Sequence, residues 1–318
     1  MDDPFKNGLN VFIVGSPRSG TTILGELLDK HPQISQWYEP YFVWDRFFRM
    51  APHDERSAED ATIRVKEKIF RDFERYRKNK KCLVLIDKSP RNSLKIPFIL
   101  KIFPRARFIH LLRDGRDVTL SINKEWHRRR IIVNDPEQKG QFNYLKALRV
   151  LRNFLKRQTF LEDKLRAIWF ETHGHFLNKS RQLNRIRWKG GIGWGPRFKN
   201  WQKVYAETSP LQFNANQWSA CVKCIQRDWS LIQQQNRLTL RYEDLITNPG
   251  KKIDEILEFI GIASSIGFIE SLPELKANNY NKWKNEFTPS QLETIYSILT
   301  PQLLTLGYAG SEEWLNEN

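Results

Sequence analysis

VFIVGSPRSGTTILGELL, residues 11–28, decides the fold. The segment begins as a short apolar run, passes through glycine, serine and proline, and continues with apolar residues at helical spacing. This order predicts a buried strand, a tight loop and a helix whose first backbone amides face the loop. Amides at such a helix start bind anions, so the segment predicts a phosphate-binding loop from Gly15 to Thr22.

Three further apolar runs resemble the first strand: CLVLIDK at 82–88, RFIHLLR at 107–113 and LTLRYEDL at 238–245. Segments with helical spacing separate them, and two more helical segments follow near the C-terminus. Strands that are almost wholly apolar and alternate with helices indicate a parallel sheet covered on both faces. The predicted fold class is therefore α/β, a P-loop-like parallel β-sheet flanked by helices, in a single domain over residues 1–318.

The positive charge is concentrated in one part of the chain. The 318 residues carry a formal charge of +16, and residues 124–203 hold 20 Lys and Arg against 6 Asp and Glu, which is +14 of that total. The run KALRVLRNFLKRQ from Lys146 has helical spacing. We expect residues 124–203 to form a basic, mostly helical insert that faces an anionic partner such as nucleic acid, a membrane surface, an acidic polymer or a phosphorylated cofactor.

Composition excludes several classes of protein. Hydrophobic residues make up 40% of the chain, which is too many for a disordered protein. No apolar run approaches the roughly 18 residues that a membrane span needs, so no membrane span is expected. Three cysteines are too few for a disulfide scaffold. We expect a cytoplasmic protein, with a trimmed lumenal domain as the alternative.

The loop departs from that of nucleoside triphosphatases at one position. Thr21 stands where those enzymes carry the lysine that reaches the terminal phosphates. Arg18, inside the loop, supplies a cation instead. This combination predicts that the loop binds an anion without a metal; the alternative is an ordinary strand-to-helix turn.

PRSGTT at 17–22, RDGRDVTLS at 113–121 and RYEDLITNP at 241–249 together resemble the sulfotransferases that use 3′-phosphoadenosine 5′-phosphosulfate (PAPS). The motif spacing is most similar to that of the tyrosylprotein and Golgi-type carbohydrate enzymes. The resemblance implies that Arg113 and Ser121 hold the 3′-phosphate of the nucleotide. It also implies that the loop holds the 5′-phosphosulfate through Arg18, Ser19, Gly20, Thr21 and Thr22.

The same resemblance implies the catalytic residues. Glu39, in WYEPYF, matches the catalytic base of those enzymes, and Lys88, in DKSPRN, matches a catalytic lysine. Arg18 is expected to stabilise the transferring group together with Lys88. Tyr242 and Lys282 match residues that contact the nucleotide. His31 ends a helix and His110 lies inside a strand, so we expect neither histidine to act as the base.

The predicted function is transfer of a sulfuryl group from PAPS to an acceptor hydroxyl, without a metal, leaving adenosine 3′,5′-bisphosphate (PAP). We expect a carbohydrate acceptor, because a basic insert suits an anionic glycan; peptide tyrosine, a phenol, a small alcohol or a lipid are alternatives. A P-loop small-molecule kinase is a second hypothesis. A non-enzymatic nucleic-acid-binding protein is a third, although no nucleic-acid partner is expected because no such motif is present.

Overall fold

The computed structural model describes residues 8–48, 51–134, 187–188, 191–192, 195–276 and 279–315. The chain divides into two compact units. One, here called the sheet unit, comprises residues 1–39, 53–123 and 195–318, and the other comprises residues 40–52 and 124–194. Most of the predicted insert, including the segment from Lys146, lies outside the described residues. The single domain and the bounds of the insert stay predictions.

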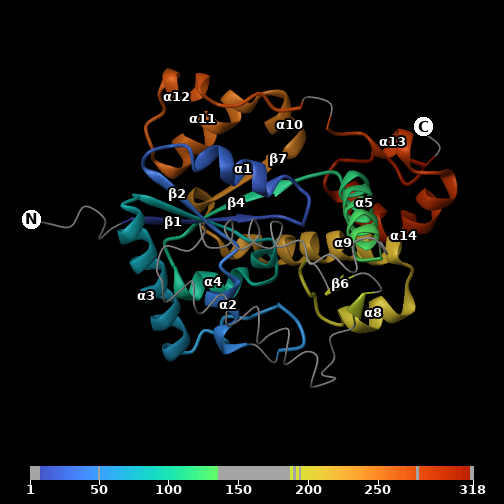
Figure 1. The fold of residues 1–318 in the computed structure, drawn as a ribbon, viewed down its shortest axis with the longest axis horizontal. Coiled ribbons are helices and arrows are strands. Elements are labelled where there is room, and N and C mark those ends of the chain that lie inside the picture. Colours follow the sequence, from blue (N-terminus) through green and yellow to red (C-terminus); the bar gives the residue numbers. More distant parts are fainter. Residues whose placement is uncertain are drawn as a thin grey trace, which may run out of the picture. The chain divides into compact units, whose positions relative to one another are not determined.

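A five-stranded parallel sheet forms the centre of the sheet unit (Figure 1). Its order is β2-β3-β1-β4-β7. The strands are β1 (Leu9–Val14), β2 (Ile34–Tyr38), β3 (Val84–Lys88), β4 (Arg107–Leu112) and β7 (Arg237–Arg241). The predicted α/β class is confirmed, and the fifth strand is β2, which the sequence analysis did not predict. β2 lies at an edge of the sheet, where its polar residues Ser35 and Gln36 interrupt the apolar pattern.

Helices cover both faces of the sheet. The main helices of the sheet unit are α1 (Thr21–Leu28), α3 (Ile63–Lys80), α4 (Ile96–Ile102), α8 (Trp201–Glu207), α9 (Pro210–Asp228), α10 (Tyr242–Thr247), α11 (Pro249–Ile260), α12 (Ile266–Glu270), α13 (Trp283–Glu286) and α14 (Pro289–Thr305). Short 3₁₀ helices are η2 (Pro90–Leu94), η3 (Trp229–Leu231) and η4 (Gln234–Asn236). In Figure 1, α1, α10, α11 and α12 lie on one side of the sheet, and α3 and α4 lie on the other. None of the described helices is both long and apolar enough to span a membrane.

Alternate residues of each strand pack on opposite faces. Val11 and Ile13 of β1 belong to the aliphatic cluster that includes residues of α1, α10 and α11. Phe12, between them, faces an aromatic cluster, with its ring centroid 5.4 Å from that of Phe108 and 6.0 Å from that of Phe73 on α3. A strand that is buried on both faces has no exposed position for a polar side chain, and residues 11–14 of β1 are accordingly all apolar.

Two helices of the sheet unit begin with the usual capping signals. Ser209 and Thr288 form capping boxes at the starts of α9 and α14, each followed by a proline at the first helical position. The helix α5 spans Gly115–Asn134. Its residues from 124 on belong to the second unit, which also contains α2 (Tyr41–Trp44), η1 (Asp45–Phe47), β5 (Arg187–Trp188) and β6 (Gly191–Ile192).

A buried carboxylate joins three distant segments of the sheet unit. Asp54 pairs with the guanidinium of Arg197 at 2.5 Å and with Arg91 of η2 at 3.4 Å, and it also accepts the backbone N–H of Arg197 at 2.8 Å. The two arginines hold the pKa of Asp54 well below its ordinary value, against the effect of burial. Arg197 belongs to the basic stretch, so this part of its charge is neutralised inside the protein.

Asp54→Asn should lower the free energy of unfolding at pH 7 by about 3–5 kcal/mol, because it leaves two arginines beside a neutral amide. Since the pKa of Asp54 is depressed, its contribution is present above the ordinary carboxyl value of 3.8 and is lost as the pH falls below it. Urea unfolding should therefore show the difference from wild type narrowing in acid. Asp254→Asn, on the exposed side of α11, is the control, and equal stability of the Asp54 and Asp254 variants would contradict the assignment.

Candidate active site

Five of the predicted site features lie at the carboxyl ends of the five strands. In sheet order they are Glu39 after β2, Lys88 at the end of β3, the loop 15–20 after β1, Arg113 after β4 and Tyr242 after β7. Open parallel sheets bind ligands at this edge, at the point where the strand order reverses. The reversal here lies beside β1, since the chain forms β2 and β3 on one side of it before crossing to β4 on the other.

The loop after β1 is held by its own serine and by η2. The Ser93 hydroxyl accepts the Gly15 N–H and donates to the Gly15 carbonyl, both at 2.9 Å. Within the loop, the buried Ser19 hydroxyl donates to the Ser16 carbonyl at 2.6 Å. Arg18 adopts a left-handed backbone, with φ 67°, which turns the chain into α1. The predicted loop is therefore a constrained turn with an exposed arginine at its tip.

The start of α1 leaves backbone donors without a side-chain cap. Gly20 occupies the cap position with φ 91° and provides no side-chain acceptor, and the first turn contains no acidic residue. Thr21 is buried and Thr22 is half-buried at the first two helical positions. The first amides of a helix need an acceptor, and an anionic group satisfies them well.

Glu39 and Lys88 form one ion pair. Lys88 is 1% exposed, and its ammonium donates to the Glu39 carboxylate at 2.6 Å while lying 3.9 Å from the centroid of the Tyr38 ring. The Glu39 N–H also donates to the Lys88 carbonyl, at 3.2 Å. Glu39 keeps a quarter of its side chain exposed. The structure thus brings the predicted base and the predicted catalytic lysine together, with the carboxylate on the accessible side.

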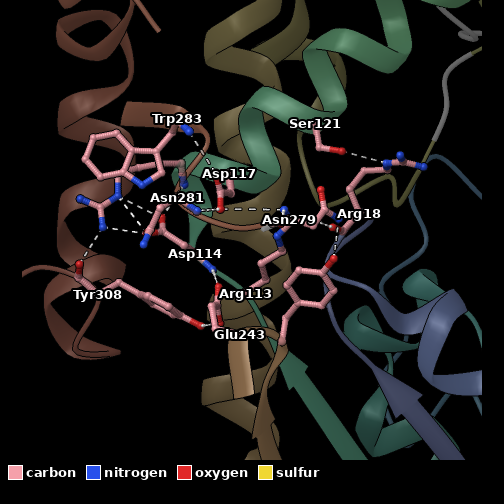
Figure 2. A network of polar contacts seen from close by, with 12 residues as sticks. Arg18, Arg113, Asp114, Asp117, Ser121, Glu243, Asn279, Asn281, Trp283 and Tyr308 are labelled. Carbon is pink, nitrogen blue, oxygen red and sulfur yellow. Dashed lines mark hydrogen bonds and ion pairs between the residues drawn. The ribbon is translucent and has the colours of Figure 1, made fainter. Parts of the chain in front are cut away.

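Arg18, Arg113 and Ser121 form a second group (Figure 2). The Arg18 side chain donates through Nε to the Ser121 hydroxyl at 3.1 Å, so it lies beside the residues predicted to hold the 3′-phosphate. Arg113 donates to the Arg18 carbonyl at 2.9 Å, and its guanidinium lies 4.3 Å from the centroid of the Tyr242 ring. The buried Nε of Arg113 has no hydrogen-bond partner among the described residues.

A C-terminal segment passes next to this second group. The Asn279 carbonyl accepts from Arg113 at 2.8 Å, and the Asn279 amide donates to the Tyr242 hydroxyl at 2.6 Å. Lys282, predicted to contact the nucleotide, is exposed and lies between Asn281 and Trp283. The backbone N–H groups of those two residues donate to the Asp117 carboxylate. Sequence reasoning did not predict these contacts of Asn279 and Asp117.

A further network connects the start of α5 to the C-terminal residues (Figure 2). The Arg116 guanidinium pairs with the Asp114 carboxylate at 2.7 Å, donates to the Tyr308 carbonyl at 2.7 Å and lies 3.9 Å from the centroid of the Trp283 ring. Glu243 accepts from the Asp114 N–H and the Tyr308 hydroxyl, and burial raises its pKa. In the sequence, the alternating charges of RDGRD, residues 113–117, were the one signal of this network, because buried charges need partners of opposite sign.

His31, His110 and the two cysteines of α9 take structural positions. Burial lowers the pKa of His110, inside β4, to about 4, so its ring is neutral at pH 7. His31 accepts the Gln33 N–H and contacts the Phe268 ring. Cys221 and Cys224 are buried on α9, where desolvation raises the pKa of both thiols. The described part of the chain contains no group of three or more His, Cys, Asp or Glu that could hold a metal ion.

The family model described as "Sulfotransferase family" matches residues 10–172, about half of the chain. The chain belongs to the sulfotransferase family. It is similar to the Protein-tyrosine sulfotransferase of Drosophila melanogaster, with 32% identity over 124 residues, 35% of this chain and 24% of that protein. It is also similar to Nodulation protein NoeE of Sinorhizobium fredii, with 28% identity over 130 residues, 36% of this chain and 31% of that protein. The match therefore spans only about a quarter to a third of these relatives' length.

Solved sulfotransferase structures resemble the whole chain. The sulfotransferase domain from the curacin biosynthetic pathway has a TM-score of 0.51 at 14% identity and covers 92% of this chain and 98% of that domain. The sulfotransferase domain of the Synechococcus PCC 7002 olefin synthase has a TM-score of 0.51 at 15% identity, with 95% and 96% covered. At this identity the likeness shows the fold, and it agrees with the parallel sheet described above.

Gly20→Ala should weaken PAP binding at least tenfold. A Cβ at this position would lie 2.3 Å from the Tyr242 ring, and a φ of 91° strains any residue other than glycine. The variant should therefore shift the loop, Tyr242 or both. Isothermal titration calorimetry with PAP measures the loss, with Gly310→Ala as the control because nothing lies within 4 Å of its Cβ position. Wild-type affinity in the Gly20 variant would show that the loop does not contact the nucleotide.

Proposed function

We propose that this protein transfers a sulfuryl group from PAPS to an acceptor hydroxyl. The order of residues along the sheet edge carries the proposal: Glu39 and Lys88 lie on one side of the loop after β1, and Arg113 and Tyr242 lie on the other. A donor that lies across this loop presents its phosphosulfate to the loop amides and its 3′-phosphate to Arg113. The reacting sulfur then faces the Glu39 side, where the acceptor would bind.

The chemistry of Arg113 fits a phosphate. A guanidinium has five N–H donors, and only two of them are used by the carbonyls of Arg18 and Asn279. The buried Nε of Arg113 has no partner among the described residues, and a buried orphan donor is costly unless a ligand satisfies it. Ser121, on α5, lies close to the loop, because its hydroxyl accepts a hydrogen bond from Arg18. Arg113 and Ser121 would hold the 3′-phosphate of the nucleotide, and Arg18 would stabilise the transferring group together with Lys88.

The reaction is an in-line displacement at sulfur. A bond forms between the acceptor oxygen and the sulfur while the bond between the sulfur and the 5′-phosphate oxygen breaks, and PAP leaves with that electron pair. The acceptor proton passes to the Glu39 carboxylate. Negative charge grows on the leaving oxygen, where Lys88 and the loop amides stabilise it, as in phosphoryl transfer. The proposal invokes no metal, because these residues supply the positive charge.

The acceptor is proposed to be a carbohydrate hydroxyl on an anionic glycan, since the charge of +14 over residues 124–203 would attract such a polymer. Peptide tyrosine is the second candidate, and the similarity to protein-tyrosine sulfotransferases favours it. Both acceptors fit the same proton transfer to Glu39. They differ in what the basic residues would have to recognise.

Labelled PAPS, incubated with the protein and with a panel of anionic glycans, tyrosine peptides and phenols, tests both the function and the acceptor. We expect label transfer to a glycan hydroxyl, and we expect Arg128, Arg129 and Arg130 changed together to Gln to raise the acceptor KM without changing PAP affinity. Transfer to tyrosine alone would select the second candidate. Binding of ATP with magnesium but not of PAP would instead support a kinase and overturn the proposal.

Glu39→Gln should retain PAP affinity and lower kcat by about 10²–10⁴-fold, which is the usual contribution of a general base. The amide can still accept a hydrogen bond from Lys88 but cannot take the acceptor proton. Single-turnover kinetics with PAPS measures the chemical step directly. Glu258→Gln, on the exposed side of α11, is the matched control. A Glu39 variant with a near wild-type chemical step would remove Glu39 from the mechanism.

A further inference from the structure

The segment 279–283 has little regular structure of its own, and a single carboxylate fastens much of it. Asp117, on α5, is 2% exposed. One of its oxygens accepts the Asn281 N–H at 2.7 Å, and the other accepts the Trp283 N–H at 3.1 Å. Lys282 lies between these two anchored residues, so the Asp117 carboxylate fixes the backbone on either side of it.

The other end of the segment is fastened to the predicted nucleotide site. Asn279 accepts from the Arg113 guanidinium through its carbonyl and donates to the Tyr242 hydroxyl through its side chain. Asn281 has a left-handed backbone, with φ 55°, a conformation that asparagine tolerates better than most residues. The segment therefore turns sharply between Arg113 and Asp117, which are four residues apart in the sequence and form an ion pair at 3.8 Å.

The negative charge of Asp117 determines which groups its side chain can contact. A carboxylate that contacted a phosphate directly would weaken its binding through like-charge repulsion. Each Asp117 oxygen instead accepts one backbone N–H of the segment, and one oxygen also lies 3.8 Å from the Arg113 guanidinium, so the carboxylate acts on the segment and on Arg113 and not on the ligand. Charge-assisted hydrogen bonds of this kind are about twice as strong as neutral ones, which suits a segment without a ladder of its own. Figure 2 shows Asp117 between Asn281, Trp283 and Arg113.

We propose that Asp117 is a positioning residue that holds segment 279–283 against Arg113 and thereby places Lys282 to bind the 3′-phosphate of the nucleotide. This proposal rests on the proposed function. It assigns the placement of Lys282 to a buried carboxylate on the same helix as Ser121. In the absence of Asp117, Arg113 would keep its place at the end of β4, but Lys282 would lose the anchors on both sides of it.

Titration calorimetry of the full chain with PAP and with adenosine 5′-diphosphate, which has no 3′-phosphate, tests the proposal. Asp117→Ala should weaken PAP at least tenfold, about 1.4 kcal/mol, and should change adenosine 5′-diphosphate affinity by less than threefold. In turnover, the loss should appear in the KM for PAPS more than in kcat. Asp228→Asn, a buried aspartate on α9 that pairs with Arg227, is the control and should retain wild-type PAP affinity.

A double-mutant cycle with Lys282→Ala separates positioning from a general loss of structure. If Asp117 acts by placing Lys282, Lys282→Ala should cost little PAP affinity once Asp117 is alanine, although it costs at least tenfold in the wild type. Additive losses, or an Asp117 variant that binds PAP as the wild type does, would overturn the proposal. If Asp117→Ala does not fold, Asp117→Asn, which keeps one carbonyl acceptor, is measured in its place.

The titrations distinguish a failure of this proposal from a failure of the proposed function. A wild-type protein that does not bind PAP contradicts the proposed function, and the proposal for Asp117 fails with it. A wild-type protein that binds PAP, together with an Asp117 variant in which both nucleotides weaken equally, leaves the proposed function standing. That second result would show that Asp117 serves the stability of the fold and does not position Lys282.

Discussion

All five strands run in one direction, and the site depends on this constraint. A parallel sheet places the carboxyl ends of its strands along one edge, so residues that are distant in the sequence follow one another there. Glu39 and Tyr242 stand at the two ends of that row, although most of the chain separates them in sequence. The loop after β1 lies in the middle because β1 is the central strand. The same constraint separates the ion pair of Glu39 from the cation of Arg113.

Arg113 and Arg116 are three residues apart, and their charges are balanced to different extents. Arg116 is paired with Asp114, packed on Trp283 and bonded to a carbonyl, so its charge is neutralised within the fold. Arg113 donates to two backbone carbonyls, which orient its guanidinium without cancelling the charge. Asp117 pairs with Arg113 only at 3.8 Å and shares its carboxylate with two backbone N–H groups. Positive charge therefore remains at the sheet edge, where an anion would bind. The network around Arg116 holds the neighbouring backbone in place.

The sequence predicts the parts of the site that local patterns determine. Apolar runs predict four strands, and the glycines around the loop after β1 predict its place, because a close turn before a helix needs them. β2 was missed because Ser35 and Gln36 interrupt its apolar residues, so the segment does not resemble a buried strand. The contacts of Asp117 and Arg116 join positions 164 and 192 residues apart, and no local pattern encodes such pairs. Most of the basic stretch lies outside the described residues.

Glu39 shows how backbone and side chain are specified together. Its φ of 46° is unfavourable for a residue with a Cβ, and it stands before a proline, where the chain prefers an extended conformation. Lys88 opposes this cost twice, since its carbonyl accepts the Glu39 N–H and its ammonium holds the Glu39 carboxylate. Glycine would suit this backbone better but would remove the carboxylate. The left-handed turn after β2 therefore depends on the Glu39 side chain. The ion pair with Lys88 that stabilises this turn also directs the carboxylate to the accessible side of the sheet edge.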